Sequence, residues 1–307
     1  MTLPYDPATA GATKDLLHLI GVTPNRTLGQ NFLINRGALD RIVDTAAVTE
    51  ADHVLEIGPG LGALTCRLAA RAGRVTAIEK DAQFIDFLRP QMPDGKVFFV
   101  AGDALETDWE VLGLPDEGVK VVANLPYSIS KPILRRFLED WRPHLLSATL
   151  TVQREVADRI VAKPSTAAYG PMAIMTQLHG KAKRKFDISP GSFWPPPNVT
   201  SSVVHIEVRQ IPSVELSDEK FFWRVVRAAF GQRRKQLGNT LRAVISDKEH
   251  LFDTLRVVNI DAQRRGETLS LAEFAALSNH LATSHAALVA PQDGVELGQD
   301  DDIIPAV

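Results

Sequence analysis

Two kinds of apolar pattern alternate over roughly the first 160 residues of the chain. Short apolar runs predict strands at 53–57, 74–79, 97–101, 119–123 and 147–153, and the first four of them end in glycine, an acidic residue or asparagine. Apolar positions that recur every three or four residues predict helices at 37–47, 61–70, 82–88, 133–141 and 155–162. Strands that alternate with helices in this way are typical of an α/β fold with a mostly parallel sheet, covered by helices on both faces.

The pattern changes near residue 164. Residues 171–178 fit a helix or a strand, and strands are predicted at 183–188 and 202–208. Pro195–Pro197 exclude regular helix and central strand, because three prolines remove three backbone donors. After Pro212 only helical patterns remain, at 221–230, 235–245, 251–257 and 271–280.

These patterns divide the chain into three parts. We expect an α/β domain over residues 1–210 and a small all-helical domain over 211–285. Residues 286–307 are rich in glycine, aspartate and proline and are expected to form a disordered acidic tail.

Composition narrows the class of protein. The 307 residues are 45% hydrophobic and 23% charged, without an apolar run of the ~20 residues that a membrane span requires. The N-terminus lacks the pattern of a secretion signal, and the single cysteine, Cys66, excludes an intramolecular disulfide. The eight histidines lack the spacing of metal ligands. We therefore expect a cytoplasmic protein, a monomer, without a metal or a membrane partner.

Charge is distributed unevenly. The formal net charge is −3, yet residues 181–242 hold twelve Lys or Arg against five acidic residues. The densest clusters are Lys181–Lys185 and Arg233–Lys235, and Arg264–Arg265 is a third. Arg227 and Arg234 are expected to share one helix face. Such runs are usually solvated surface, but they become candidate phosphate contacts if the partner is a nucleic acid.

A glycine-rich loop, Glu56–Gly62, follows one predicted strand and precedes a helix. Glycine lets the backbone turn tightly and approach a ligand. By itself the loop fits a dinucleotide site, a methyl-donor site or a plain turn. Two acids at the ends of the next strands sharpen the prediction: Glu79 is placed to accept ribose hydroxyls, and Asp103 to accept the amine of an adenine ring. Pro59 and the acid Glu56 favour S-adenosylmethionine, because a carboxylate can hold its cationic amino-acid end.

The tetrapeptide Asn124–Tyr127 follows the fourth predicted strand. An exocyclic adenine amine is a poor nucleophile because its lone pair is delocalised into the ring. Two acceptors aimed at its hydrogens, the Asn124 side-chain oxygen and the Pro126 carbonyl, would localise that pair for methyl transfer. The Tyr127 ring could stack on a base that has left its helix. Alone, the tetrapeptide would indicate a turn; with the glycine loop, it indicates a catalytic site.

The chain resembles the ribosomal RNA adenine dimethyltransferases of the dimethyladenosine-synthase type, a bacterial family. The resemblance spans about residues 24–285 and rests on Leu28–Leu33, Glu56–Gly62, Glu79–Asp81, Gly102–Ala104, Asn124–Tyr127, Phe193–Pro197 and Ser201–Val204, in the family's order.

The resemblance implies a Rossmann-like methyltransferase sheet, S-adenosylmethionine as cofactor and a role for each matched residue. Asn31 and Leu33 would close over the methyl donor, whose methionine part would contact Gly58. Glu79 would hold the ribose and Asp103 the adenine, and Asn124 would face the reaction centre. The remaining aromatic residue, Phe193, would sandwich the target base against Tyr127.

The implied activity is N6-dimethylation of two adjacent adenines in the 3′-terminal hairpin of 16S ribosomal RNA, within the small ribosomal subunit or its precursor. Three alternatives stay open from the sequence. They are a large-subunit ribosomal RNA methylase that confers macrolide resistance, a ribosome-assembly factor whose binding role outweighs catalysis, and a DNA adenine methylase.

Overall fold

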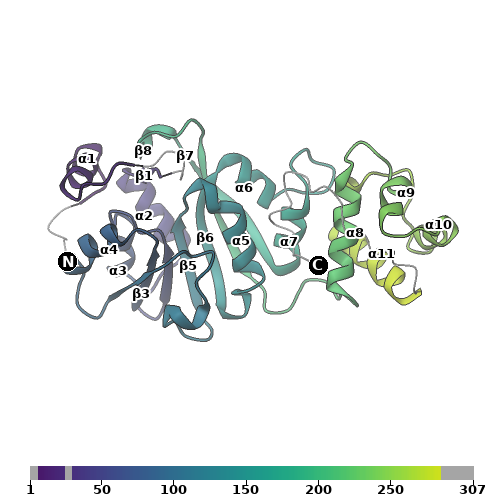
Figure 1. Cartoon of the computed structure of the whole chain (residues 1–307), viewed down its shortest axis with the longest axis horizontal. Helices are drawn as coiled ribbons and strands as arrows, with labels where there is room; N and C mark the ends of the chain where they lie inside the picture. Colours follow the sequence, from purple (N-terminus) through teal and green to yellow (C-terminus); the bar gives the residue numbers. More distant parts are fainter. Residues whose placement is uncertain (1–5, 25–29, 285–307) are drawn as a thin grey trace. The chain divides into compact units, whose positions relative to one another are not determined.

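The computed structural model describes residues 6–24 and 30–284, which form two compact units (Figure 1). The first unit comprises residues 1–157 and 181–210, and the second comprises residues 158–180 and 211–307. The acidic tail predicted at 286–307 lies outside the described residues.

A seven-stranded sheet forms the centre of the first unit, in the order β4-β3-β2-β5-β6-β9-β7. The β2–β3, β3–β4, β2–β5 and β5–β6 pairs are parallel and the β6–β9 pair is antiparallel, which confirms the mostly parallel sheet. The strands are β2 (His53–Ile57), β3 (Arg74–Glu79), β4 (Val97–Ala101), β5 (Val119–Asn124), β6 (Leu145–Gln153), β7 (Gly180–Ile188) and β9 (Ser201–Val208).

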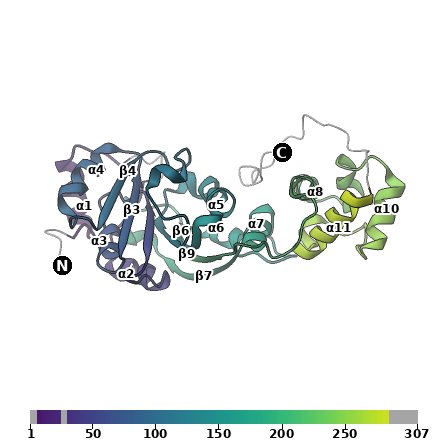
Figure 2. The ribbon, with the colours of Figure 1, turned by 90° about the horizontal axis from the view of Figure 1, so that it is seen from below.

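Helices cover both faces of this sheet: α2 and α3 lie on one side and α5 on the other (Figures 1 and 2). Helix α2 buries Leu39, Ile42 and Val43 against sheet residues that include Val54, because its apolar positions recur every three or four residues. The helical segments of this unit are α1 (Ala10–Leu19), α2 (Arg36–Thr45), α3 (Thr65–Ala69), α4 (Ala82–Leu88), η1 (Arg89–Gln91), η2 (Trp109–Leu112), η3 (Tyr127–Ile129), α5 (Ser130–Leu138), η4 (Arg142–His144) and η5 (Pro190–Ser192). Helix α6 (Arg154–Ile160) begins in this unit and ends in the second.

Helix α3 is shorter than the helix predicted at 61–70, because the glycine loop continues into residues whose apolar spacing had suggested a helix. Gly62 has φ +82°, a left-handed conformation that is incompatible with a helix start. A side chain there would also clash, since a Cβ atom would lie 2.6 Å from a Leu88 methyl carbon.

A separate two-stranded sheet joins β1 (Phe32–Leu33) to β8 (Phe193–Trp194) in antiparallel register, with Leu33 opposite Phe193. The Ile34 amide extends the pairing by donating to the Ser192 carbonyl at 2.8 Å. Pro195–Pro197 lie outside helix and strand, as predicted.

The second unit is helical in its described part, with α7 (Pro171–His179), α8 (Glu219–Gly231), α9 (Leu237–Thr240), η6 (Leu241–Ala243), α10 (Lys248–Val257), η7 (Gly266–Thr268) and α11 (Leu271–Ser284). The chain passes from the first unit to the second at 210/211, where the boundary was predicted, but residues 158–180 also belong to the second unit, which was not predicted. Helix α7 packs on α8 and α11, and the Ser213 amide donates to the Leu178 carbonyl at 2.9 Å.

Two helix predictions in this unit were wrong in extent. The helix predicted at 235–245 is reduced to α9 and η6, because the Leu237 and Gly238 amides donate to the Arg264 and Ala262 carbonyls. Helix α8 ends at Gly231, so Arg227 and Arg234 do not share a helix face.

Candidate active site

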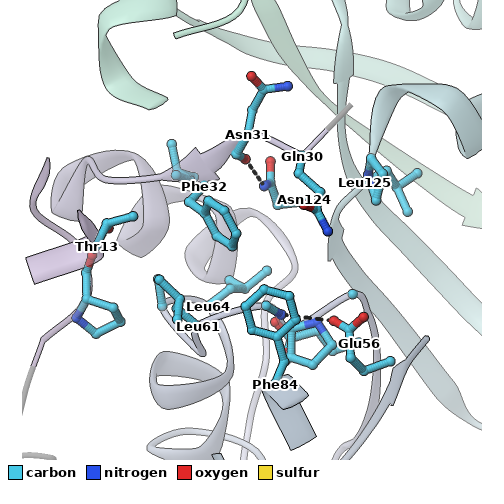
Figure 3. A pocket seen from close by; sticks show the side chains of 18 of the residues that line it. Thr13, Gln30, Asn31, Phe32, Glu56, Leu61, Leu64, Phe84, Asn124 and Leu125 are labelled. Carbon is cyan, nitrogen blue, oxygen red and sulfur yellow. Dashed lines mark hydrogen bonds between the residues drawn. The ribbon is translucent and has the colours of Figure 1, made fainter. Parts of the chain in front are cut away.

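A pocket lies at the carboxyl ends of β2, β3 and β5 in the first unit (Figure 3). Open α/β sheets bind ligands at this edge, because the loops that leave parallel strands meet there. The pocket is lined by Pro7, Thr13, Gln30, Asn31, Phe32, Leu33, Leu39, Glu56, Gly58, Pro59, Gly60, Leu61, Ala63, Leu64, Glu79, Phe84, Asn124, Leu125 and Pro126.

The glycine loop forms one wall. Gly58 has φ +67° and its amide donates to the Ile78 carbonyl at 2.9 Å, which ties the loop to β3. Gly60 has φ +54°, and a Cβ atom there would lie 3.0 Å from the Phe32 ring. Glycine is therefore needed at position 60 for its backbone conformation and for close approach to β1.

Glu79, at the end of β3, is buried beside this loop. Its Oε2 accepts the Gly60 amide at 3.2 Å and its Oε1 accepts the Asp81 amide at 3.0 Å. Burial raises the pKa of this carboxyl, and these amide hydrogen bonds oppose the rise. Each oxygen keeps a second lone pair that can accept a ligand hydroxyl.

Glu56, in β2, is the most unusual group of the pocket. Its side chain is 2% exposed, and its Oε2 has no hydrogen-bond partner within the described residues. Burial raises the pKa of this carboxyl to about 8; the nearby Thr65 hydroxyl opposes the rise, and the neighbouring Glu79 adds to it. A buried, unsatisfied carboxyl in a ligand pocket is suited to a cationic group, which would restore its charge and supply the missing donor.

The predicted catalytic tetrapeptide begins where β5 ends. The Asn124 Nδ2 donates to the Asn31 carbonyl at 3.2 Å, so the strand end is tied to the segment that leads into β1 (Figure 3). With its NH₂ group so used, the side-chain oxygen of Asn124 is the atom left to accept a hydrogen bond. Asn124, Asn31 and Leu33 thus line the same pocket as Gly58 and Glu79.

The Pro126 carbonyl is already engaged, because it accepts the Ile129 amide at 3.2 Å and the Ser130 hydroxyl at 3.3 Å. No hydrogen bond reaches the Leu125 carbonyl among residues 6–24 and 30–284. Both residues line the pocket. The Leu125 carbonyl, which the sequence analysis did not consider, is therefore the more available acceptor.

The two predicted base-stacking residues do not line the pocket. The Tyr127 hydroxyl lies 2.6 Å from the Ser201 hydroxyl, and burial raises the pKa of Tyr127. Phe193 is 2% exposed and packs in an apolar cluster with Leu33 and Leu39. Its ring supports β1 here, so stacking on a base would require it to leave this cluster.

Asp103, which follows β4, lies outside the pocket lining. Its Oδ2 accepts the Lys80 ammonium at 2.7 Å and its Oδ1 accepts the Leu105 amide at 2.9 Å. The Lys80 hydrogen bond lowers the pKa of this carboxyl, so Asp103 is held ionised. The register pairs Glu79 with Ala101, which places Asp103 one strand away from Glu79.

Six pocket residues were not predicted as site residues: Pro7, Thr13, Leu39, Ala63, Leu64 and Phe84. Thr13 and Leu17 are both buried, four residues apart on α1, and this spacing was the available signal. Periodicity does not say what an apolar face packs against, so the contribution of α1 to the pocket was not predictable.

Each of the three basic clusters is partly used within the protein. In the first cluster, Arg184 lies 3.9 Å from Asp187. The Arg264 guanidinium donates to the Glu273 carboxylate and, at 2.7 Å, to the Thr268 carbonyl. Arg233 donates to the Ala167 carbonyl at 2.8 Å and lies 3.4 Å from Glu267. Arg264 is thus engaged within the second unit, and its contact with phosphate stays a prediction.

Within the described ranges, no helix combines the length and apolarity of a membrane span. The same residues contain no group of three or more His, Cys, Asp or Glu side chains placed to share a metal ion.

Comparison with known proteins gives one consistent family. Residues 21–282 match the family described as ribosomal RNA adenine dimethylase. The chain is 43% identical to ribosomal RNA small subunit methyltransferase A of Listeria monocytogenes serotype 4b, over 90% of this chain and 97% of that protein. It is 42% identical to the protein of the same name from Bacillus licheniformis, again over 90% and 97%.

Solved structures share the fold. A dimethyladenosine transferase from Plasmodium falciparum superposes with a TM-score of 0.68 at 26% identity, covering 80% of this chain and 95% of that one. The 23S rRNA methyltransferase ErmE superposes with a TM-score of 0.62 at 24% identity, covering 82% and 100%. At that identity, ErmE is informative about the fold alone.

Proposed function

The chain belongs to the ribosomal RNA adenine dimethylase family, and from this premise we propose that it dimethylates N6 of two adjacent adenines in the 3′-terminal hairpin of 16S ribosomal RNA. The predicted family, the methyltransferase fold and the enzyme class, an rRNA adenine dimethyltransferase, are confirmed by the match and the superposition. The relatives named for the small subunit support that subunit over the large one.

We propose S-adenosylmethionine as the methyl donor. When bound, it supplies a methyl group on a sulfonium centre, which is electrophilic enough to need no metal or strong base. The observation that carries this proposal is Glu56: a buried carboxyl with an unpartnered oxygen lies in the same pocket as Asn124. Its chemistry fits the cationic amino-acid end of the donor.

Other pocket residues complete the donor site in this proposal. Glu79 would accept the ribose hydroxyls with its remaining lone pairs, and the glycine loop would approach the donor at Gly58. Asn31 and Leu33 would cover it, held in place by the Asn124 amide and the β1–β8 pairing. For Asp103 we retain the role of acceptor for the adenine amine, through lone pairs that Lys80 and Leu105 leave unused.

Two oxygen atoms of the chain would activate the target adenine. The Asn124 side-chain oxygen and the Leu125 carbonyl, which we prefer to that of Pro126, would each accept one N6 hydrogen. These hydrogen bonds draw the nitrogen lone pair out of the ring and towards the methyl group. In each transfer the new nitrogen–carbon bond would replace the donor's carbon–sulfur bond, and N6 would release one proton to water. After the first transfer N6 carries only one hydrogen, so one of the two acceptors suffices for the second transfer.

Tyr127 is proposed to stack on the flipped base, with its ring held by the hydroxyl contact to Ser201.

A ribosomal RNA substrate also implies action in the cytoplasm, where ribosomal subunits are assembled.

The proposal is tested by labelled methyl transfer to unmethylated small subunits, large subunits and duplex DNA. We expect transfer to small subunits alone, at two adjacent adenines by mass spectrometry. Transfer only to large subunits or only to DNA would overturn the proposal.

The Asn124→Ala variant tests the site. We expect kcat to fall by about 10²–10³, the cost of removing one oriented hydrogen-bonding group from a transition state. Ser128→Ala, at the exposed residue just after the tetrapeptide, is the matched control and should retain activity. Full activity of Asn124→Ala would remove the tetrapeptide from the mechanism. A variant without activity that still restores small-subunit assembly would favour the assembly-factor alternative.

A further inference from the structure

Strand β7 is an outer strand of the sheet and has the densest exposed positive charge of the described first unit. Lys181, Lys183, Arg184 and Lys185 are all exposed along it. Arg184 lies 3.9 Å from Asp187, whereas the three lysines have no ion pair within the described residues. Three uncompensated cations on one short strand are a feature that neither the sheet nor the donor pocket requires.

The spacing of these lysines is regular. Lys181, Lys183 and Lys185 alternate along the strand and therefore point to the same side of it. Since a strand rises about 3.3 Å per residue, successive lysines stand about 6.6 Å apart and span about 13 Å. Such a row can contact successive charges on an extended polyanion, and lysine binds phosphate as a flexible point charge.

A chain of contacts connects this row to the catalytic tetrapeptide. Asp187, two residues beyond Lys185, accepts the Ser202 hydroxyl at 2.7 Å. The adjacent Ser201 hydroxyl lies 2.6 Å from the Tyr127 hydroxyl. Strands β7 and β9 are neighbours in the sheet and run side by side in Figure 2. Ser201 and Ser202 point to opposite faces of β9, so the lysines and the Tyr127 hydroxyl lie on different faces. The row nevertheless ends, at Lys185, near the edge of the sheet that carries the catalytic tetrapeptide.

We propose that the exposed edge of β7 binds the phosphate backbone of the RNA strand that flanks the target adenine. This inference rests on the proposed function, which supplies the RNA. Lysines on an outer strand can also serve only to prevent two sheets from pairing edge to edge. That purpose would not require the row to reach the edge of the sheet that carries the catalytic tetrapeptide, so charge and position together favour RNA.

The test is a salt titration of binding to a fluorescently labelled RNA hairpin with two adjacent adenines in its loop. The variant is Lys183→Gln/Lys185→Gln. Its matched control is Arg89→Gln/Lys96→Gln, which removes the same charge near β4, the opposite outer strand, outside the pocket lining. Because each lost phosphate contact lowers the slope of log K against log salt by about 0.7–0.9, we expect a loss of about 1.4–1.8 for the β7 variant. The control should keep the slope of the unmodified protein.

Equal slopes for the unmodified protein and the β7 variant would overturn the inference, as would equal losses in both variants. Self-association of the β7 variant with an unchanged slope would assign the lysines to edge protection and would also overturn it. The methylation assay on small subunits separates this failure from that of the proposed function. If the unmodified protein transfers no methyl group, the proposed function fails; if it does and the slopes are equal, only this inference fails.

Discussion

Glu56 is the single residue on which the pocket's electrostatics depend most. Its pKa of about 8 means that the folded protein holds a proton at neutral pH that the unfolded chain has released above about pH 4.5. Between these two values the folded state binds one proton more than the unfolded state, so stability falls as pH rises. The slope for one proton is about 1.4 kcal/mol per pH unit, an upper bound for this group.

Glu56→Gln should remove this dependence, because an amide is neutral at every pH in the range. We expect the free energy of unfolding of the variant, measured by urea denaturation from pH 5 to 8.5, to exceed that of the unmodified protein increasingly towards pH 8. Affinity for S-adenosylmethionine should fall at the same time. Glu50→Gln, at an exposed carboxyl, is the control. Parallel stability curves for Glu56→Gln and the unmodified protein would show that Glu56 is ionised in the free enzyme.

At the scale of elements, the short β1–β8 sheet connects the segment expected to recognise the base with the segment expected to cover the donor. Phe193 lies opposite Leu33 in this pairing, and both side chains are buried in the same cluster. The ring is thus placed to hold β1, which carries Phe32 and Leu33 to the pocket.

Phe193→Leu should therefore weaken donor binding. The leucine keeps an apolar side chain but not the ring, at a cost of about 1–2 kcal/mol in stability. Calorimetric titration with S-adenosylmethionine measures the first effect and urea denaturation the second. Val199→Ala, at a largely exposed position on the same connection, is the control. Unchanged stability and donor affinity, together with loss of the fluorescence change of 2-aminopurine at the target adenine, would instead assign the ring to the flipped base.

Periodicity predicted the central elements of the sheet closely. Strands β3 and β4 and helix α4 have the predicted bounds, since each is a short apolar pattern between polar residues and packs on neighbours of the same kind. The length of helix α3 was overestimated because the spacing of apolar residues does not report the φ angle of Gly62. Helix α9 was overestimated because its amides bond to a segment more than twenty residues away.

The sequence predicted those site residues that can be recognised from their position at the end of a single strand. Glu79 and Asn124 follow strands and line the pocket, as expected. Asp103 also follows a strand, yet its carboxylate is held by Lys80, a contact that no motif encodes. Burial of the Phe193 ring and use of the Pro126 carbonyl likewise depend on tertiary contacts.

At the scale of the whole molecule, the second unit shows why a boundary drawn from composition was incomplete. The pattern change near residue 164 is real, because residues 158–180 belong to the helical unit. The chain then returns to the first unit to supply β7, β8 and β9. The sequence alone does not show that the chain leaves the first unit and comes back to it. Residues 181–210 have the same strand pattern as the earlier sheet, and residues 171–178 fit either a helix or a strand, so nothing marked 158–180 as part of another unit.

The chain forms two compact units, and both bury apolar side chains. We therefore predict that the helical unit can be loosened without loss of the donor site. Gly266 is the position to change, since a Cβ atom there would lie 2.5 Å from the Ala229 carbonyl oxygen. Gly266→Ala should destabilise the second unit by about 1–3 kcal/mol, the usual cost of overpacking. Gly231→Ala is the control, because a Cβ atom there meets nothing within 4 Å.

Hydrogen exchange with and without S-adenosylmethionine separates the two units. We expect Gly266→Ala to lose protection in α8 and η7 while β2, β3 and β5 keep theirs and still gain protection from the donor. A ligand stabilises the conformations that bind it, so protection should rise where opening destroys the donor pocket, and every lining residue of that pocket lies in the first unit. If donor affinity fell together with the protection of α8, the pocket would depend on the helical unit, and the assignment of the whole donor site to the first unit would be wrong.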